Sequence, residues 1–295
     1  MINLKKLKND YLGLNEVIDI PYSKKLTGGK AINICKYSGL VTVIKRRSSK
    51  IIANEWSNKI YGKSLNKDKY TSNVPVIISR QTYVLETILL KINLKGKFLL
   101  DVGAGEGSFL NMLKKKKITK NLFGLEPSKK NCKKIRKMNI MTFNNRIEEH
   151  SFNQTKKLFD VVTLMWTLCN CSNAYETIKS VYKSLKPNGY IVVAEGSRIM
   201  VPFKKPIQTY FGKNEPDLHP FHFSKNTLCS LLILNKFKIV HVNRYIDSDF
   251  LLIIAKKVNK IDTKSIKIDN YKKVKSFFVD WYRHSKLYKS EIVNN

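Results

Sequence analysis

A glycine-rich segment that lies close to two acidic residues has the residue types and spacing of a ligand-binding loop. Residues 99–110 read LLDVGAGEGSFL, where Asp101 ends an apolar run and three alternate glycines follow. Glycine has no Cβ atom, so the backbone can turn sharply and approach a ligand, and the helix that follows offers unpaired N–H groups. Nineteen residues beyond Gly107, Glu126 ends another apolar run in GLEPS, where a carboxylate can accept both hydroxyls of an adenosine ribose.

The glycines and Glu126 also have simpler explanations, and the acids discriminate between ligands. A tight turn would explain the glycines alone, and Glu126 could be an acid at a helix start ahead of Pro127. In NAD sites the glycine backbone binds a pyrophosphate, normally through GxGxxG, whereas Gly107 arrives here one residue early. Asp101 and Glu106 would repel phosphates, so the loop favours a ligand that carries an ammonium group.

From residue 97 onward, strand and helix patterns alternate, which positions the loop at the end of a strand. The predicted strands are 97–102, 121–125, 139–143, 159–165, 190–195, 237–244 and 249–256, and the predicted helices between them are 107–117, 128–138 and 173–185. Strands separated by helices imply right-handed crossovers and a parallel sheet covered on both faces. The last two strands are too close in sequence for a parallel crossover, so one of them must run antiparallel. We therefore predict an α/β fold with a doubly wound, seven-stranded and mostly parallel sheet.

The two ends of the chain carry weaker patterns. Residues 1 to about 30 show little periodicity, AINIC and LVTVIK form a predicted hairpin, and helices are predicted near 50–61 and 72–92. A Lys-rich tail follows the last strand and contains a predicted helix around FFVDWYRHSKLY. The predicted parts are an N-terminal hairpin and helix at 1–70, the main domain at 71–256 and the basic tail at 257–295.

The stretch from about 97 to 256 resembles the class I S-adenosylmethionine-dependent methyltransferases. LLDVGAGEGSFL resembles their first motif, GLEPS their second, FDVVTLMWTL their fourth strand, and SLKPNGYIVVAE their later turn and strand. The resemblance implies a Rossmann-like sheet with an antiparallel seventh strand, and S-adenosyl-L-methionine as the cofactor. The implied cofactor contacts are Asp101, Gly103 and Gly105 around the methionine part, with Ala104 and Gly107 in the same loop, Glu126 on the ribose, Asn145 and Arg146 beside the adenine, and Met165 and Trp166 at the sulfonium.

The segment ICKYSGLV resembles half of the zinc ribbon CxxCGLV that precedes the methyltransferase domain in a bacterial group associated with sugar and cell-envelope modification. Cys35 keeps the first ligand position, but Ser38 replaces the second, and one thiolate cannot build a tetrahedral zinc site. We therefore expect no metal. The five cysteines are odd in number and form no CxxC pair, which predicts reduced thiols. With no signal-peptide pattern and no transmembrane run, we expect a cytoplasmic protein.

Charged residues after the fifth predicted strand are candidates for binding the methyl acceptor. These substrate-binding candidates are Glu195, Arg198, Lys204 and Lys205, in EGSRIMVPFKKP. Arg and Lys side chains at this position could clamp a phosphate or a carboxylate, although solvated surface charges explain them equally well. They favour a small, anionic acceptor.

Two histidines follow in DLHPFHFS, directly before a predicted helix capped by Ser224. The segment resembles the HEHxxYFS element of sugar C-methyltransferases, with His219 at its second His and His222 at its Tyr. A histidine with a pKa near neutrality could take a proton from the acceptor before methyl transfer, so His219 and His222 are the candidate catalytic residues. Pro216 replaces the Tyr that normally precedes the pair, which leaves C-methylation open, and a loop histidine is more often structural.

The formal charge of +33 suggests a nucleic-acid partner, but the residue types weaken that interpretation. Only eight of the 55 basic residues are Arg, the side chain favoured for bidentate phosphate recognition. Lysines spread along the chain with many Asn and Ile are typical of proteins from AT-rich genomes. We predict a methyltransferase acting on a small acceptor such as a nucleotide-linked sugar or an envelope precursor. An RNA methyltransferase and a non-catalytic cofactor-binding protein are the alternatives, and the methylated atom (O, N or C) and the oligomeric state stay open.

Overall fold

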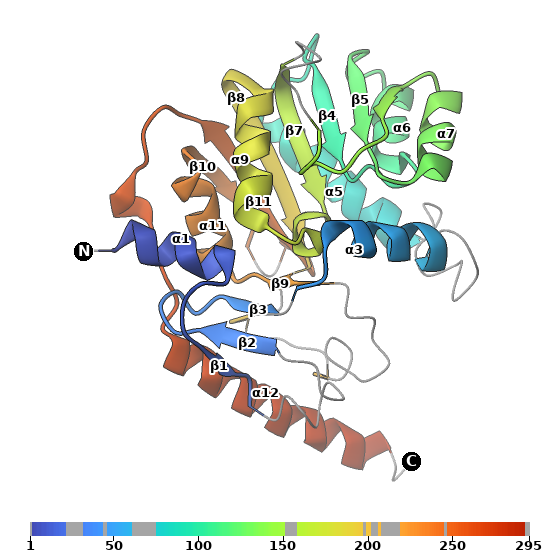
Figure 1. Cartoon of the computed structure of the whole chain (residues 1–295). Helices are drawn as coiled ribbons and strands as arrows, with labels where there is room; N and C mark the ends of the chain where they lie inside the picture. Colours follow the sequence, from blue (N-terminus) through green and yellow to red (C-terminus); the bar gives the residue numbers. More distant parts are fainter. Residues whose placement is uncertain are drawn as a thin grey trace.

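The main body of the chain is built on one seven-stranded sheet (Figure 1). The computed structural model describes residues 2–21, 32–43, 46–60, 75–150, 158–196, 199–201, 206–207, 219–244 and 247–292. The strands of the large sheet are β4 (Leu99–Val102), β5 (Leu122–Leu125), β6 (Met141–Phe143), β7 (Phe159–Met165), β8 (Leu185–Glu195), β10 (Phe237–Val242) and β11 (Leu251–Lys257). Their order across the sheet is β10-β11-β8-β7-β4-β5-β6.

Strand direction in this sheet agrees with the prediction from the sequence. Strands β4, β5, β6, β7 and β8 pair in parallel, whereas β11 runs antiparallel to both β8 and β10. The short connection between β10 and β11 requires this reversal, because a parallel crossover needs a dozen or more residues. The predicted single antiparallel strand is therefore confirmed, and it is the last strand of the sheet in chain order.

Helices cover both faces of the large sheet. They are α5 (Pro75–Lys91), α6 (Ser108–Lys115), α7 (Lys129–Lys137), α9 (Ala174–Ser184) and α11 (Lys225–Leu234). Apolar side chains of α9 and α11 pack on one face, and those of α5, α6 and α7 pack on the other. Side-chain caps begin three of them, since Ser128, Asn173 and Ser224 each accept a backbone N–H in the first turn of α7, α9 and α11.

A second, smaller sheet combines the N-terminal hairpin with a strand from far along the chain. Its strands are β1 (Val17–Asp19), β2 (Ile32–Cys35), β3 (Val41–Val43) and β9 (Phe221–His222), all antiparallel and in that order. The predicted hairpin is confirmed as β2 and β3. Because β9 pairs with β3, this sheet brings the segment that carries His222 next to the N-terminal part of the chain.

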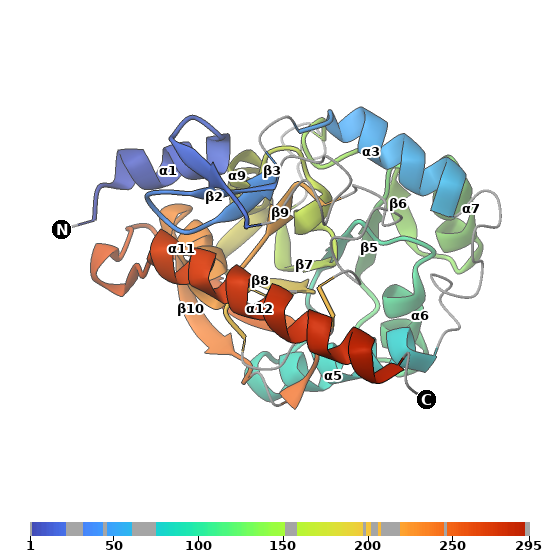
Figure 2. The ribbon, with the colours of Figure 1, turned by 90° about the horizontal axis from the view of Figure 1, so that it is seen from below.

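The C-terminal helix α12 (Tyr271–Ile292) lies across the small sheet (Figure 2). Val274, Phe278 and Trp281 on one side of this helix are buried against Ile34 and Val41 of the sheet. A short 3₁₀ turn, η4 (Thr263–Ser265), precedes α12. The aromatic residues of the helix predicted around FFVDWYRHSKLY thus form a core with the hairpin.

The first helix, α1 (Leu4–Leu12), lies in a region where the sequence showed little periodicity. Asn3 caps its start, and Gly13 ends it in the left-handed conformation at φ 75°. The hydroxyl of the buried Tyr11 donates to the Thr227 carbonyl at 2.6 Å, which ties α1 to α11. The apolar stripe of this helix is short, so the sequence alone did not indicate the helix.

The helix α3 (Ser49–Glu55) continues as a π-helical turn, η1 (Trp56–Ile60), in agreement with the helix predicted near 50–61. Such wide turns are rare and often occur at functional sites. No helix in the described part of the chain is long and apolar enough to span a membrane.

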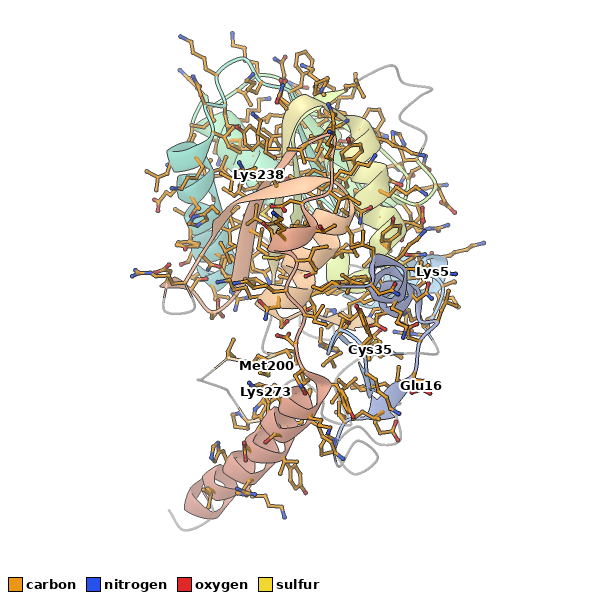
Figure 3. The ribbon with its side chains drawn as sticks, turned by 90° about the vertical axis from the view of Figure 1, so that its left-hand side faces the viewer. Lys5, Glu16, Cys35, Met200, Lys238 and Lys273 are labelled. Carbon is orange, nitrogen blue, oxygen red and sulfur yellow. The ribbon has the colours of Figure 1, made fainter. Side chains whose placement is uncertain are left out.

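Lysines project from well-separated parts of the surface (Figure 3). Lys5 on α1, Lys238 on β10 and Lys273 on α12 are all exposed. This distribution agrees with a composition-wide lysine bias more than with one basic patch.

Candidate active site

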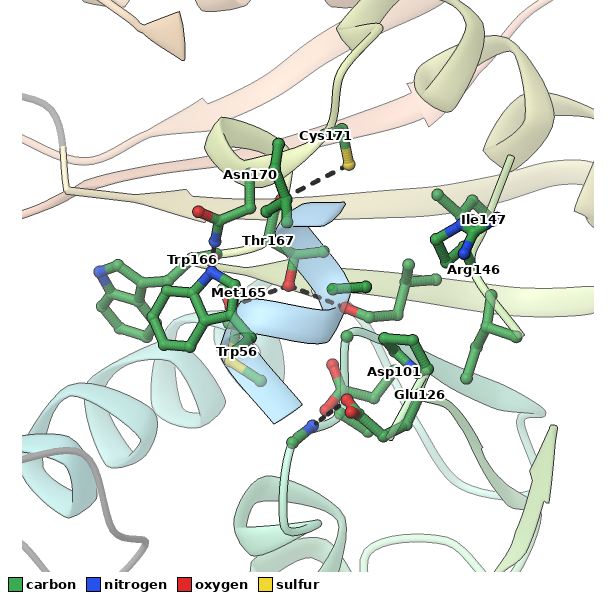
Figure 4. Close-up of a pocket in the computed structure, with 18 of the residues that line it drawn as sticks. Trp56, Asp101, Glu126, Arg146, Ile147, Met165, Trp166, Thr167, Asn170 and Cys171 are labelled. Carbon is green, nitrogen blue, oxygen red and sulfur yellow. Dashed lines mark hydrogen bonds between the residues drawn. The ribbon is translucent and has the colours of Figure 1, made fainter. Parts of the chain in front are cut away.

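A cavity of about 500 Å³ opens at the carboxyl ends of β4, β5 and β7 (Figure 4). In doubly wound sheets, ligands bind at this edge, where the strand order reverses. The cavity is walled by the glycine loop after β4, the segments after β5, β6 and β7, and side chains of α3, η1 and α5. Of the candidate cofactor residues, those that line it are Asp101, Gly103, Ala104, Gly105, Glu126, Asn145, Arg146, Met165 and Trp166.

Gly103 allows the glycine loop to pack closely against Thr167, in the segment after β7. Its φ is 71°, and its N–H donates to the Leu125 carbonyl at 2.8 Å. A Cβ atom added here would overlap the hydroxyl of Thr167, which itself donates to the Val102 carbonyl at 3.1 Å. Glycine is thus required at this position because the loop after β7 packs directly on its Cα atom.

Replacing Gly103 with alanine is expected to destabilise the fold by about 2 kcal/mol or more, because left-handed strain and steric overlap add together. Gly96 is a matched control, since its φ is 70° and a Cβ there would meet no atom within 4 Å. Gly96→Ala should cost only about 1 kcal/mol, the strain alone. Urea unfolding of both variants measures the difference, and equal losses would show that the contact with Thr167 carries no weight.

Gly107 does not line the cavity. It is the N-cap of α6 at φ 82°, and a Cβ there would press on Ile135 of α7 and on Met138, the C-cap of that helix. This glycine permits close packing between α6 and α7.

Asp101, the acid before the glycines, is a buried carboxyl group at the end of β4. Its Oδ1 atom accepts the hydroxyl hydrogen of Thr163 at 2.6 Å. Burial raises the pKa of Asp101 to about 7; the Thr163 hydrogen bond opposes this shift, and the nearby Glu126 charge adds to it. The carboxyl is therefore poised to ionise when a cation approaches.

Glu126, the acid after β5, is held rigidly by backbone donors. Its Oε2 atom accepts the Gly105 N–H at 2.9 Å, and its Oε1 atom accepts the Ser128 N–H at 2.9 Å. Burial raises the pKa of Glu126 to about 7, against the effect of these two hydrogen bonds. Among the residues that the structure describes, no Lys or Arg side chain forms an ion pair with either Asp101 or Glu126.

The other acids and the arginines that line the cavity already have side-chain partners. Glu106 pairs with Lys134, and Glu148 accepts the Ser49 hydroxyl hydrogen at 2.7 Å. The guanidinium groups of Arg80 and Arg146 pair with Asp249 and Glu149, respectively. Asp101 and Glu126, which have no ion pair among the described residues, suit a ligand with an ammonium group and hydroxyl donors, and they oppose a pyrophosphate. The residues present therefore fit S-adenosylmethionine and disfavour NAD.

Trp166 follows β7 directly and contributes an aromatic wall. Its φ of 52° is unusual for a bulky residue, and its N–H donates to the Ala194 carbonyl at 2.7 Å. The indole ring lies 5.1 Å from the Phe250 ring and 5.6 Å from the Arg80 guanidinium carbon. Trp56 of η1 also lines the cavity (Figure 4).

His219 also lines the cavity, and its Nδ1 atom lies 2.7 Å from Oδ1 of Asn170. His222 lies on β9, and its ring is 6.4 Å from that of His219. Burial and, to a smaller extent, the charge of His219 together lower the pKa of His222 to about 3. The structure thus brings His219 to the cavity, while His222 is outside its lining.

Glu195 is buried beneath the 3₁₀ turn η2 (Leu168–Asn170) and does not line the cavity. Its Oε1 atom accepts the Leu168 N–H at 2.8 Å and the Cys169 N–H at 3.3 Å. Burial raises the pKa of this carboxyl to about 7. The remaining acceptor-binding candidates, Arg198, Lys204 and Lys205, lie outside the described residues.

Sequence reasoning missed the helical segments that form the roof of the cavity, and it missed Asn170, a polar residue in the lining. The roof is formed by Ile52, Ala53 and Trp56 of α3 and η1, and by residues of α5. The helical pattern predicted these elements but carried no signal for where they pack. Asn170, in contrast, had a signal, since a polar residue just beyond a parallel strand lies at the ligand-binding edge.

Comparisons with known proteins agree with the geometry. Residues 79–242 match a family model described as a methyltransferase domain. No curated protein sequence matches the chain. The magnesium protoporphyrin IX methyltransferase of Synechocystis with bound S-adenosylhomocysteine aligns with a TM-score of 0.52 and 13% identity, over 72% of this chain and 100% of that chain.

Two further solved structures share the fold. A SAM-dependent methyltransferase of Thermotoga maritima aligns with a TM-score of 0.51 and 17% identity, over 70% of this chain and 100% of that chain. A chain from the complex of the Trm112 methyltransferase activator with a methyltransferase of Haloferax volcanii gives a TM-score of 0.54 and 13% identity, over 73% of this chain and 100% of that chain. The family match covers more than half of the chain, and the chain therefore belongs to the methyltransferase domain family as an S-adenosylmethionine-dependent methyltransferase.

Proposed function

We propose that the protein methylates a small, anionic acceptor such as a nucleotide-linked sugar or a cell-envelope precursor, with His219 as the general base. The observation that carries this proposal is that His219 lines the same cavity as the glycine loop and Glu126. A cavity of about 500 Å³ is in the range of small-molecule sites, about 300–1,000 Å³. The roof formed by α3 and η1 supports a small acceptor over a macromolecular one.

In this proposal the cofactor lies along the glycine loop. Asp101 pairs with its amino group, and Glu126 accepts the ribose hydroxyls. The adenine lies beside Asn145 and Arg146. Met165 and Trp166 flank the sulfonium, where the faces of the indole ring attract positive charge. Bound S-adenosylmethionine supplies a methyl group on a positively charged sulfur, which is already activated for transfer.

The chain's own residues then position the acceptor and manage its proton. His219 removes one proton from the acceptor oxygen, nitrogen or carbon. The electron pair left behind would form the bond to the methyl group as the methyl–sulfur bond breaks and its electron pair stays on the sulfur. Trp56 and the rest of the roof exclude water from the reacting atoms. Holding the acceptor in line with the methyl group can supply much of the acceleration.

The anionic character of the acceptor is supported by the charge of the chain. The net charge of +33 raises the local concentration of anions around the protein. The proposed clamp residues Arg198, Lys204 and Lys205 follow β8 in the sequence.

The N-terminal hairpin is proposed to be a degenerate half of a zinc ribbon. Ser38, at the position of the missing second thiolate, donates its N–H to Oδ2 of the buried Asp10 at 2.8 Å. A carboxylate thus holds the turn that a metal would hold in an intact ribbon. In the described part of the chain, no group of three or more His, Cys, Asp or Glu side chains is arranged to bind a metal ion.

A radiolabelled methyl-transfer assay tests the proposed acceptor class. The purified protein is incubated with S-adenosylmethionine carrying a labelled methyl group and a panel of nucleotide sugars and anionic envelope precursors. Label should pass to at least one of them and depend on His219. An RNA methyltransferase is the second candidate, favoured by the net charge, and transfer to RNA but to no small molecule would support it. Its RNA binding would also weaken steeply with salt.

Cofactor binding should depend on pH because Asp101 and Glu126 both have a pKa raised to about 7. An ammonium group and ribose hydroxyls favour the ionised carboxylates, so binding lowers both pKa values and releases protons near neutrality. The affinity for S-adenosylhomocysteine should fall as pH drops below about 7, by up to about tenfold per pH unit for each carboxyl that must ionise, and level off above about pH 8.

Isothermal titration at several pH values, in buffers of different ionisation enthalpy, measures both the affinity and the released protons. Asp101→Asn should release fewer protons than the wild type. A dissociation constant that stays constant from about pH 5.5 to 8.5 would show that the two carboxyls are not the groups that hold the cofactor.

A further inference from the structure

We infer that Asn170 is a positioning residue that holds His219 in one tautomer, with the proton on Nδ1 and the basic lone pair on Nε2. The inference rests on the proposed role of His219 as general base, and it adds the partner that would prepare that base. The position of Asn170 in MWTLCNCS, just beyond β7, indicates the ligand-binding edge of the sheet but assigns no role to its side chain.

The hydrogen bonds of the Asn170 amide fix its orientation. Its Nδ2 atom donates to the Trp166 carbonyl at 2.8 Å, and its Oδ1 atom lies 2.7 Å from Nδ1 of His219. A carbonyl oxygen can only accept, so the NH₂ group must face Trp166 and the amide oxygen must face the imidazole. An amide oxygen also only accepts, so Nδ1 of His219 must donate. In the neutral ring the lone pair is then on Nε2.

The backbone around Asn170 is anchored on several sides. Glu195 accepts two consecutive N–H groups of the η2 turn, those of Leu168 and Cys169. The Thr167 hydroxyl donates to the Val102 carbonyl, and the Asn170 N–H donates to the Thr167 carbonyl at 3.0 Å. A turn held in this way leaves the amide little freedom to rotate, which is what a positioning residue requires.

His222 is a poor substitute for this arrangement. Its backbone is committed to the small sheet through its pairing with Val41, and its ring stands nearly perpendicular to that of His219, at 84°. The tautomer is inferred from the contact between Nδ1 of His219 and the amide oxygen of Asn170. Glu195 affects His219 only indirectly, because it holds the η2 turn that carries Asn170.

Nitrogen NMR of the full-length protein labelled with ¹⁵N-histidine tests the inference directly. At about pH 8, where an ordinary imidazole is neutral, the shifts and couplings of the two ring nitrogens distinguish the tautomers. The His219 signals are assigned by their loss in His219→Gln. The expected result is a protonated Nδ1 and an unprotonated Nε2, and the opposite tautomer in the wild-type protein would overturn the inference.

Variants of Asn170 separate positioning from general support of the fold. Asn170→Ala should shift the His219 signals towards a mixture of tautomers, whereas Asn170→Asp, whose carboxylate still accepts from Nδ1, should keep the wild-type tautomer. Asn235→Ala is the matched control, because the Asn235 amide also donates to the carbonyl four residues earlier, that of Leu231, at 2.9 Å. This control should leave His219 unchanged. Unaltered His219 signals in folded Asn170→Ala would also overturn the inference.

The NMR experiment needs neither cofactor nor acceptor, so its outcome is separate from that of the methyl-transfer assay. If methyl transfer is absent but the tautomer is as expected, the proposed function fails and the hydrogen-bond arrangement stands. With an acceptor in hand, Asn170→Ala should lower kcat by about 10- to 100-fold with little change in KM, and Asn170→Asp should restore most of it. An equal kcat in Asn170→Ala and the wild type would contradict a positioning role.

Discussion

Replacing His219 with glutamine should lower the rate of methyl transfer by about 10²- to 10⁴-fold, the usual contribution of a general base. Glutamine approximates the size and polarity of the imidazole but cannot accept a proton at neutral pH. His219 is not among the proposed cofactor contacts, so the affinity for S-adenosylhomocysteine should stay at the wild-type value. The rate is measured as labelled methyl transfer to the acceptor identified in the screen, and the affinity by isothermal titration.

His284→Gln is the control for this substitution. His284 lies exposed on α12, and that helix packs on the small sheet. Its replacement should leave the rate unchanged. Wild-type transfer by His219→Gln would contradict the assignment of the base and would favour a reaction driven by positioning alone, because the sulfonium is already an activated donor.

Replacing Glu126 with glutamine should raise the dissociation constant of S-adenosylhomocysteine by about 10- to 100-fold, as expected for losing charge-assisted hydrogen bonds worth about 1.5–3 kcal/mol. Both carboxylate oxygens accept backbone N–H groups, and an amide can accept through only one of them. The amide NH₂ group would therefore face either Gly105 or Ser128 as a second donor and disturb the loop. Isothermal titration measures the change.

Glu126→Gln should reduce the stability of the fold less than it reduces the affinity for the ligand. The pKa of Glu126 is raised to about 7, so the neutral carboxyl is already well populated in the ligand-free protein near neutral pH, and a neutral amide adds no new burial cost. Glu176→Gln, on the exposed side of α9, is the control that should leave the affinity unchanged. Wild-type affinity in Glu126→Gln would mean that the ribose hydroxyls are held elsewhere.

The large sheet could be predicted from sequence because its signals are local. Each buried strand is a short apolar run, such as FDVVTLM for β7, bounded by helices with recognisable caps. The antiparallel strand followed from the short connection between β10 and β11, since chain length alone excludes a parallel crossover. Strand ends in this sheet deviate from the predicted limits by a few residues, most at β8, which begins at Leu185.

Beyond its β2–β3 hairpin, the small sheet could not be predicted because it depends on contacts distant in sequence. Strand β9 has only two residues, Phe221 and His222, and exists because β3 offers it an open edge. Similarly, α1 and α12 are stabilised by packing against α11 and the hairpin, and a helix pattern does not indicate its partner. These contacts connect the N-terminal and C-terminal segments with the part of the chain that carries His219.

The sequence could predict which side chains lie at the carboxyl edge of the sheet where the fold itself positions them there. Asp101 and Glu126 follow strands, and their position at the carboxyl edge of the sheet is a consequence of the fold. Glu195 ends a strand in the same way, yet its side chain is buried under the η2 turn, because the N–H groups of Leu168 and Cys169 need an acceptor there. Which way a strand-end side chain turns is decided by such local demands, and the sequence does not display them.

A crystal structure of the protein with bound S-adenosylhomocysteine tests the central claim most directly. The account predicts the ribose hydroxyls within hydrogen-bond distance of the Glu126 carboxylate, the amino group on the side of Asp101, and the sulfur facing Trp166 and His219 across the cavity. A ligand seated elsewhere, or a ribose that does not contact Glu126, would contradict it.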